Sequence, residues 1–151
     1  MAQSLSKVYI HIIFHIASSS VPIKKEVDGA LYNYMGGILK ELDCVPIKIN
    51  GMPDHIHLLF VLSRMQSIAN VVEQLKINST RWLKEKDSCY QKFAWQHGYG
   101  AFSVSASICE NVKQYIEQQE SHHAKHSYQE ELREFFRRYK IEYNEKYVWN
   151  D

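Results

Sequence analysis

Cysteine, proline and glycine are scarce in this chain of 151 residues, and neither sign of charge predominates. The three cysteines, Cys44, Cys89 and Cys109, are odd in number, widely spaced and form no CxxC pair. This pattern fits a reducing compartment better than a disulfide framework or a cysteine-based zinc site. The formal net charge of +1 is low for a protein that binds nucleic acid through its phosphates, so any such surface must be a local patch.

Long apolar runs are absent as well. No segment reaches the ~20 residues needed to cross a bilayer, and residues 1–7 lack the charged and apolar regions of a signal peptide. No GxxxxGK phosphate-binding loop or internal repeat is present. The chain does have 45% hydrophobic and 13% aromatic residues, which indicates a globular core. We therefore predict one cytoplasmic domain that spans residues 1–151.

Two histidines stand out in the segment GMPDHIHLLF, residues 51–60. At the strand period of two, His55 and His57 lie on one face while Ile56 and Leu58 lie on the other, core-facing side. The two imidazoles are then about 7 Å apart along the strand and can converge on one metal ion. The alternative is that they only begin a half-exposed strand.

A helix is predicted over residues 111–123, which are rich in helix formers and contain no glycine or proline. Tyr115 and Gln119 are four residues apart, so their side chains share one helical face. A tyrosine on a helix is usually a core or interface aromatic, and Tyr115 taken by itself fits that explanation.

The order of the remaining elements predicts a ferredoxin-like α+β fold. Its antiparallel sheet would carry helices on one face and an additional C-terminal helix bearing the tyrosine on the other. Asn50-Gly51 is a strong hairpin signal before the histidine strand. The predicted strands are residues 7–17, 44–50, 55–62 and 101–105, and the other predicted helices are residues 24–43, 67–85 and 129–143.

Several other polar and aromatic residues are candidates for binding. His11 and His15 share one face of the first strand and would approach the histidine pair if the two strands are neighbours, although histidines on a strand face are more often simply solvated. The loop of residues 87–100 holds Trp95 and Tyr99, which either pack inward or stack on unpaired bases. The helix at 67–85 has a polar and basic face that suits either solvent or phosphate groups.

Four segments, taken together and in order, resemble one protein family. They are GMPDHIHLL at 51–59, QLK at 74–76 with STR at 79–81, WQHGYGAFSVS at 95–105, and Tyr115-Ile116 with Gln119-Glu120 and His122-His123. The chain resembles the single-tyrosine, single-strand DNA transposases of the insertion sequences of the 200/605 group. These belong to the HUH (His-hydrophobe-His) superfamily, together with the repeat-associated transposase-like proteins.

The resemblance implies a mechanism. Tyr115 would attack a phosphate of single-stranded DNA, leaving a 5′-phosphotyrosine link and a free 3′-hydroxyl. His55, His57 and the side-chain oxygen of Gln119 would hold Mg²⁺ or Mn²⁺. Because a tyrosine has an ordinary pKa of about 10, the metal or a base must favour its ionised form. The covalent link conserves the bond energy, so strand transfer would need no ATP.

The resemblance also implies partners: DNA hairpins at the element ends, and a second copy of the chain in a homodimer with composite active sites. The predicted DNA contacts are Lys76, Arg81, Trp95, Tyr99 and His11. Three alternatives remain at this point. They are a domesticated repeat-associated nicking protein, a non-catalytic DNA-binding regulator of the same fold, and a metal-dependent hydrolase that uses water in place of Tyr115.

Overall fold

A four-stranded antiparallel sheet lies at the centre of the computed structural model, which describes residues 2–123, 126–145 and 148–149. The strands are β1 (Val8–His15), β2 (Val45–Met52), β3 (His55–Leu62) and β4 (Gly100–Val104). Their order in the sheet is β2-β3-β1-β4, and all three neighbouring pairs are antiparallel. This topology confirms the predicted ferredoxin-like fold. No helix in the described part of the chain is long and apolar enough to cross a membrane.

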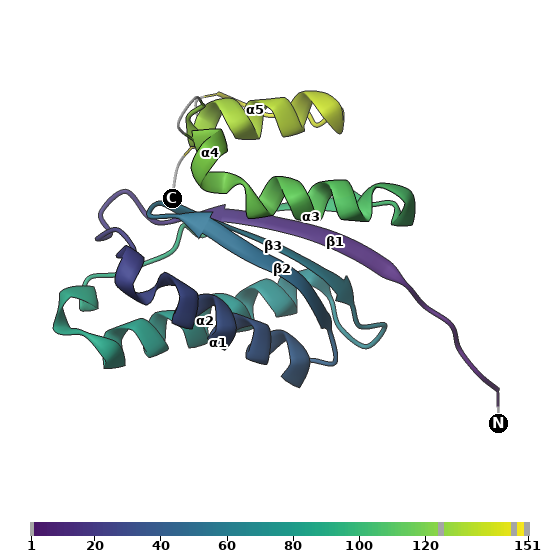
Figure 1. Cartoon of the computed structure of the whole chain (residues 1–151), viewed down its shortest axis with the longest axis horizontal. Coiled ribbons are helices and arrows are strands. Elements are labelled where there is room, and N and C mark those ends of the chain that lie inside the picture. The colour runs from purple at the N-terminus through teal and green to yellow at the C-terminus, as the bar shows by residue number, and fades with distance from the viewer. Residues whose placement is uncertain (1, 124–125, 146–147, 150–151) are drawn as a thin grey trace.

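One face of the sheet is covered by two long helices, α1 (Lys25–Glu41) and α2 (Ile68–Lys86), as Figure 1 shows. The main core lies between them and the sheet, and it takes alternate strand residues such as Ile12, Phe14, Ile56 and Leu58. The Ser67 side chain accepts a hydrogen bond from the backbone N–H of Asn70 and so begins α2 where the sequence predicted.

The opposite face carries α3 (Cys109–Glu117), α4 (Gln119–His123) and α5 (Tyr128–Arg138), which lie above the sheet in Figure 1. Two 3₁₀ turns, Ser88–Tyr90 and Ala106–Ile108, precede them in the chain. The prediction of one continuous helix over 111–123 was wrong, because the chain turns at Gln118 between α3 and α4.

The hairpin between β2 and β3 turns later than predicted. Met52 pairs with His55, so the turn consists of Pro53 and Asp54, and Asn50-Gly51 lies inside β2. A Cβ on Gly51 would meet the backbone oxygen of His55 at 2.3 Å, so glycine is required here by the close approach of the two strands. The Asn-Gly pair therefore serves strand packing and not the turn.

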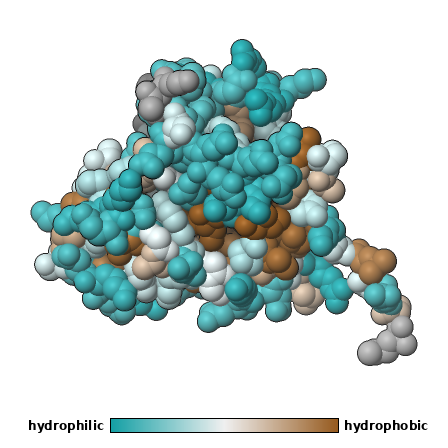
Figure 2. All heavy atoms as spheres, viewed as in Figure 1, coloured by the Kyte–Doolittle hydropathy of each residue, from teal (hydrophilic) through white to brown (hydrophobic). Residues whose placement is uncertain are grey.

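β2 is an edge strand with a register irregularity between Pro46 and Lys48. Figure 2 shows apolar side chains gathered over the middle of the visible face, where β2 runs between the two helical layers. Val45, which begins the strand, is 57% exposed.

Candidate functional site

His55 and His57 begin β3 on the sheet face that α3–α5 cover, and both are buried. The Nδ1 atom of His55 lies 2.7 Å from Asp54 Oδ1, and Nδ1 of His57 lies 2.8 Å from Nε2 of His11. Each imidazole is thus held through Nδ1, so each Nε2 is directed away from the strand toward one carboxylate, that of Glu131. Holding one ring nitrogen in this way is how proteins orient histidines that bind metal.

Glu131, in the first turns of α5, was not predicted as a site residue. It is 3% exposed, and its Oε1 lies 2.9 Å from His57 Nε2 and 3.4 Å from His55 Nε2. The sequence held a signal for it, since Glu131 shares a helical face with Phe135, four residues on, in an otherwise apolar stripe. An acid in such a stripe is buried only when it has partners.

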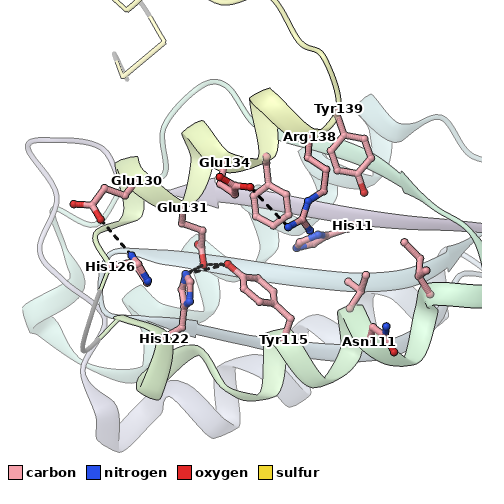
Figure 3. Close-up of a pocket in the computed structure, with 13 residues that line it drawn as sticks. His11, Asn111, Tyr115, His122, His126, Glu130, Glu131, Glu134, Arg138 and Tyr139 are labelled. Carbon is pink, nitrogen blue, oxygen red and sulfur yellow. Dashed lines mark hydrogen bonds and ion pairs between the residues drawn. The ribbon is translucent and has the colours of Figure 1, made fainter.

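Tyr115 projects from α3 toward the same carboxylate. Its hydroxyl donates a hydrogen bond to Glu131 Oε2 and lies 3.3 Å from His122 Nε2, as Figure 3 shows. The Tyr115 ring packs edge-on to His57 with 5.9 Å between ring centroids. The structure therefore brings the predicted nucleophile and the histidine pair together within a single chain.

Gln119 begins α4 and is fully buried. Its Oε1 accepts a hydrogen bond from His55 Nε2 at 3.1 Å, and its Nε2 donates to Glu131 Oε2 at 3.2 Å. The amide oxygen thus faces the histidine pair, which is where the predicted third ligand has to lie. It arrives there through the turn at Gln118 and not along one helical face with Tyr115.

Burial and the carboxylates of Asp54 and Glu131 control protonation in this cluster. Burial disfavours the charged form of His55, but hydrogen bonds to Asp54 and Glu131 outweigh it and raise the pKa of His55 to about 9. Burial lowers the pKa of His57 against the opposing effect of Glu131. Burial, followed by the charge of Glu131, raises the pKa of Tyr115 well above its ordinary value. The phenol is therefore firmly protonated in this arrangement.

The described residues fit a divalent cation. His55, His57 and Glu131 each offer a ligand atom, and these atoms lie within 4.8 Å of one another. Gln119 Oε1 adds a neutral oxygen beside them. Two imidazole nitrogens with oxygen ligands form a donor set that first-row divalent metals accept.

A cavity of about 700 Å³ opens next to Tyr115 and gives access to the site (Figure 3). Its walls come mainly from α3, α4 and α5, with His11 of β1, and combine apolar and polar side chains. They include Asn111, His122, Phe135, Arg138 and Tyr139.

Two of the predicted DNA contacts are buried. His11 is 1% exposed and contacts His57, so its role in this structure is to support the histidine pair. Trp95 is 6% exposed and donates a hydrogen bond from Nε1 to Ser79 Oγ at 2.9 Å. Of the two explanations open for Trp95, the structure favours inward packing. His15 lies beside the histidine pair of β3, as predicted for neighbouring strands, because it pairs with His55 in the sheet.

The other three candidates lie away from the cavity beside Tyr115. Lys76 Nζ donates to the backbone oxygens of residues 96–98 at 2.7–3.1 Å, and burial lowers the pKa of Lys76 to about 8. Lys76 and Tyr99 line a second cavity of about 700 Å³ beside α2. Arg81 is exposed on α2. The structure does not bring these residues to the tyrosine.

The family model described as "Transposase IS200 like" matches residues 4–119, a range that contains both histidines, Tyr115 and Gln119. The chain belongs to the IS200-like transposases. Within this family it is 26% identical over 114 residues to the ISDra2 transposase TnpA of Deinococcus radiodurans, covering 72% of this chain and 81% of that protein.

Two solved structures share the fold of this IS200-like transposase. A Deinococcus radiodurans R1 protein described as a transposase is 24% identical with a TM-score of 0.60, and the match covers 79% of this chain and 98% of that one. A REP-associated tyrosine transposase, solved bound to a REP hairpin, is 10% identical with a TM-score of 0.61. The match covers 82% of this chain and 72% of that one. Glu131 and α5 lie beyond the residues that the family model matches.

Proposed function

We propose that this IS200-like transposase cleaves and rejoins single-stranded DNA at insertion-sequence ends, with Tyr115 as the nucleophile. One observation carries the proposal: the Tyr115 hydroxyl and the Nε2 atoms of His55 and His57 all face the Glu131 carboxylate. A nucleophile beside a metal-binding set is what phosphodiester cleavage requires.

His55, His57 and Gln119 would hold Mg²⁺ or Mn²⁺, with Glu131 as an additional oxygen donor. When bound, the cation neutralises charge on the phosphoryl oxygens. Two nitrogen ligands suit Mn²⁺ better, whereas abundance in the cell favours Mg²⁺. Asp54 and His11 keep the two imidazoles oriented through their Nδ1 atoms.

Tyr115 must lose its proton as it attacks. Glu131 Oε2 already accepts the hydrogen bond from the phenol, and His122 Nε2 lies 3.3 Å away, so both are placed to take the proton. The Tyr115 oxygen forms a bond to phosphorus while the bond to the 3′ oxygen breaks, giving a 5′-phosphotyrosine and a 3′-hydroxyl. Attack on this link by the 3′-hydroxyl of another end restores the tyrosine and joins the strands without ATP.

We further propose that the protein works in the cytoplasm as a homodimer on DNA hairpins at the element ends. Tyr115 contacts the site of its own chain here. Composite active sites would therefore require α3–α5 to pass to the partner copy, with β3 remaining in place.

The test mixes purified protein with end-labelled single strands from the regions that flank its gene, in Mg²⁺ or Mn²⁺. We expect a covalent protein–DNA band on a denaturing gel that disappears with EDTA and in Tyr115→Phe. Tyr139→Phe is the matched control, because Tyr139 lines the same cavity but its hydroxyl donates to the backbone oxygen of Ser103. Cleavage that persists in Tyr115→Phe would mean that water is the nucleophile.

A second candidate is a repeat-associated nicking protein with the same chemistry, favoured by the structural similarity to the REP-associated protein. It would cut repeat hairpins found elsewhere in the genome and leave the gene's own flanks uncut. Binding without cleavage on either set of strands would instead indicate a non-catalytic regulator.

A further inference from the structure

The two oxygens of Glu131 face two different pairs of histidines. Oε1 lies toward His55 and His57, whereas Oε2 lies 3.3 Å from His122 Nε2 and 3.4 Å from His123 Nε2. The ligand atoms of His122, His123 and Glu131 are all within 4.8 Å of one another. This second set is built by α4 and α5 and uses neither histidine of β3.

His123 is the unusual member. Its side chain is 8% exposed, yet its Nε2 is buried without a hydrogen-bond partner in the described residues. A buried imidazole nitrogen that makes no hydrogen bond is destabilising, and such groups call for an explanation. A cation bound between His123, His122 and Glu131 would supply one.

Glu131 also contacts more imidazoles than a single metal ion would use. Glu131 is the acid within 4 Å of four imidazoles, and a carboxylate has enough lone pairs to bind a cation with each oxygen. The rings of His55 and His123 are 4.6 Å apart, centroid to centroid, so the two sets are neighbours joined by Glu131.

We propose that His122, His123 and Glu131 Oε2 form a second divalent metal site, bridged through Glu131 to the histidines of β3. Two imidazole nitrogens and one carboxylate oxygen suit a transition metal such as Zn²⁺ better than Mg²⁺. His122-His123 belong to the segments that resemble the family, but the whole site lies beyond residues 4–119, which the family model matches. It shares Glu131 with the site of the proposed function, but it does not depend on DNA cleavage.

The second ion would fasten α4 and α5 over the tyrosine. Its ligands His122 and Glu131 are also the two side chains that the Tyr115 hydroxyl contacts. The ion would therefore compete with the Tyr115 hydroxyl for these two side chains, which are also the groups placed to accept its proton.

The test measures metal content of the untagged full chain after Zn²⁺ loading and gel filtration, together with a Co²⁺ titration followed by visible absorption. We expect two ions per wild-type chain and one per chain of His123→Ala after gel filtration. In the Co²⁺ titration, the affinity of His123→Ala for the second ion should be at least about tenfold lower than that of the wild type. His55→Ala should also bind one ion. His97→Ala, which removes an exposed histidine that lines the second cavity beside α2, is the matched control and should bind two.

Two results would overturn the proposal: one ion per wild-type chain, or two ions that persist in both His123→Ala and His122→Ala. Circular dichroism of each variant shows whether it is folded, and His122→Ala replaces a more exposed side chain should His123→Ala fail to fold. Because the readout is ion stoichiometry without DNA, a protein that proves not to cleave strands leaves this result standing.

Discussion

At the scale of single residues, Gly51 controls how closely β2 and β3 approach beside the histidines. A methyl group there would meet the backbone oxygen of His55 at 2.3 Å and Ile56 Cα at 3.0 Å. Neither is the flexible end of a side chain, so the strand itself must move. We expect Gly51→Ala to lower the free energy of unfolding by about 1–3 kcal/mol, measured by urea denaturation.

Gly37→Ala is the matched change, since Gly37 lies inside α1 and a Cβ there meets nothing within 4 Å. It should raise the free energy of unfolding by about 0.5–1 kcal/mol, because alanine loses less backbone entropy than glycine in a helix. If Gly51→Ala and Gly37→Ala had the same free energy of unfolding, the strands at Gly51 would accommodate a methyl group without loss of stability.

At the scale of elements, α2 and α5 begin alike but are anchored differently. Ser67 and Ser127 each cap their helix by accepting a backbone hydrogen bond, at 3.0 Å and 3.2 Å. α2 buries its apolar face in the main core, whereas α5 packs its phenylalanines in a smaller cluster on the other side of the sheet. Removing each cap should therefore destabilise a different part of the molecule.

We expect Ser67→Ala to lower the free energy of unfolding of the whole protein by about 1 kcal/mol. Ser127→Ala should instead speed amide exchange in residues 128–138 by about fivefold and leave α2 unchanged. Hydrogen exchange with mass spectrometry separates the two cases. Faster exchange of α2 in Ser127→Ala would mean that α5 opens only with the whole fold.

The elements were predictable where periodicity decides them. The apolar face of β3 and the start of α2 at Ser67 follow from residue spacing alone, and both are confirmed. The turn at Gln118 carries no glycine or proline, so only the tertiary contacts of Gln119 with β3 and α5 reveal it. Glu131 could be suspected from its place in an apolar stripe, but its partners are 74 and 76 residues away in sequence and needed the fold.

At the scale of the whole molecule, the net charge of +1 gives no general attraction for DNA, so binding must depend on where individual cations lie. A strand that reaches Tyr115 crosses the face that carries Arg138, which lines the cavity and whose side chain is 67% exposed. Arg81 lies on α2, on the opposite side of the sheet.

We expect Arg138→Ala to reduce the slope of log affinity against log salt by about one for single-stranded DNA, with little change for Arg81→Ala. Fluorescence anisotropy over a salt series measures both slopes. No change in Arg138→Ala would contradict a DNA path over the cavity, and an equal loss in Arg81→Ala would show that bound DNA also reaches α2.

The irregular edge strand β2 has a consequence for whether copies of the protein can add to one another's sheets. An apolar edge with free backbone groups invites another strand to add, and a net charge near zero offers little repulsion between copies. Pro46 has no N–H to offer an incoming strand, and the irregularity before Lys48 interrupts the straight edge that it would need. A short stretch of β2 therefore protects the whole protein against aggregation through sheet extension.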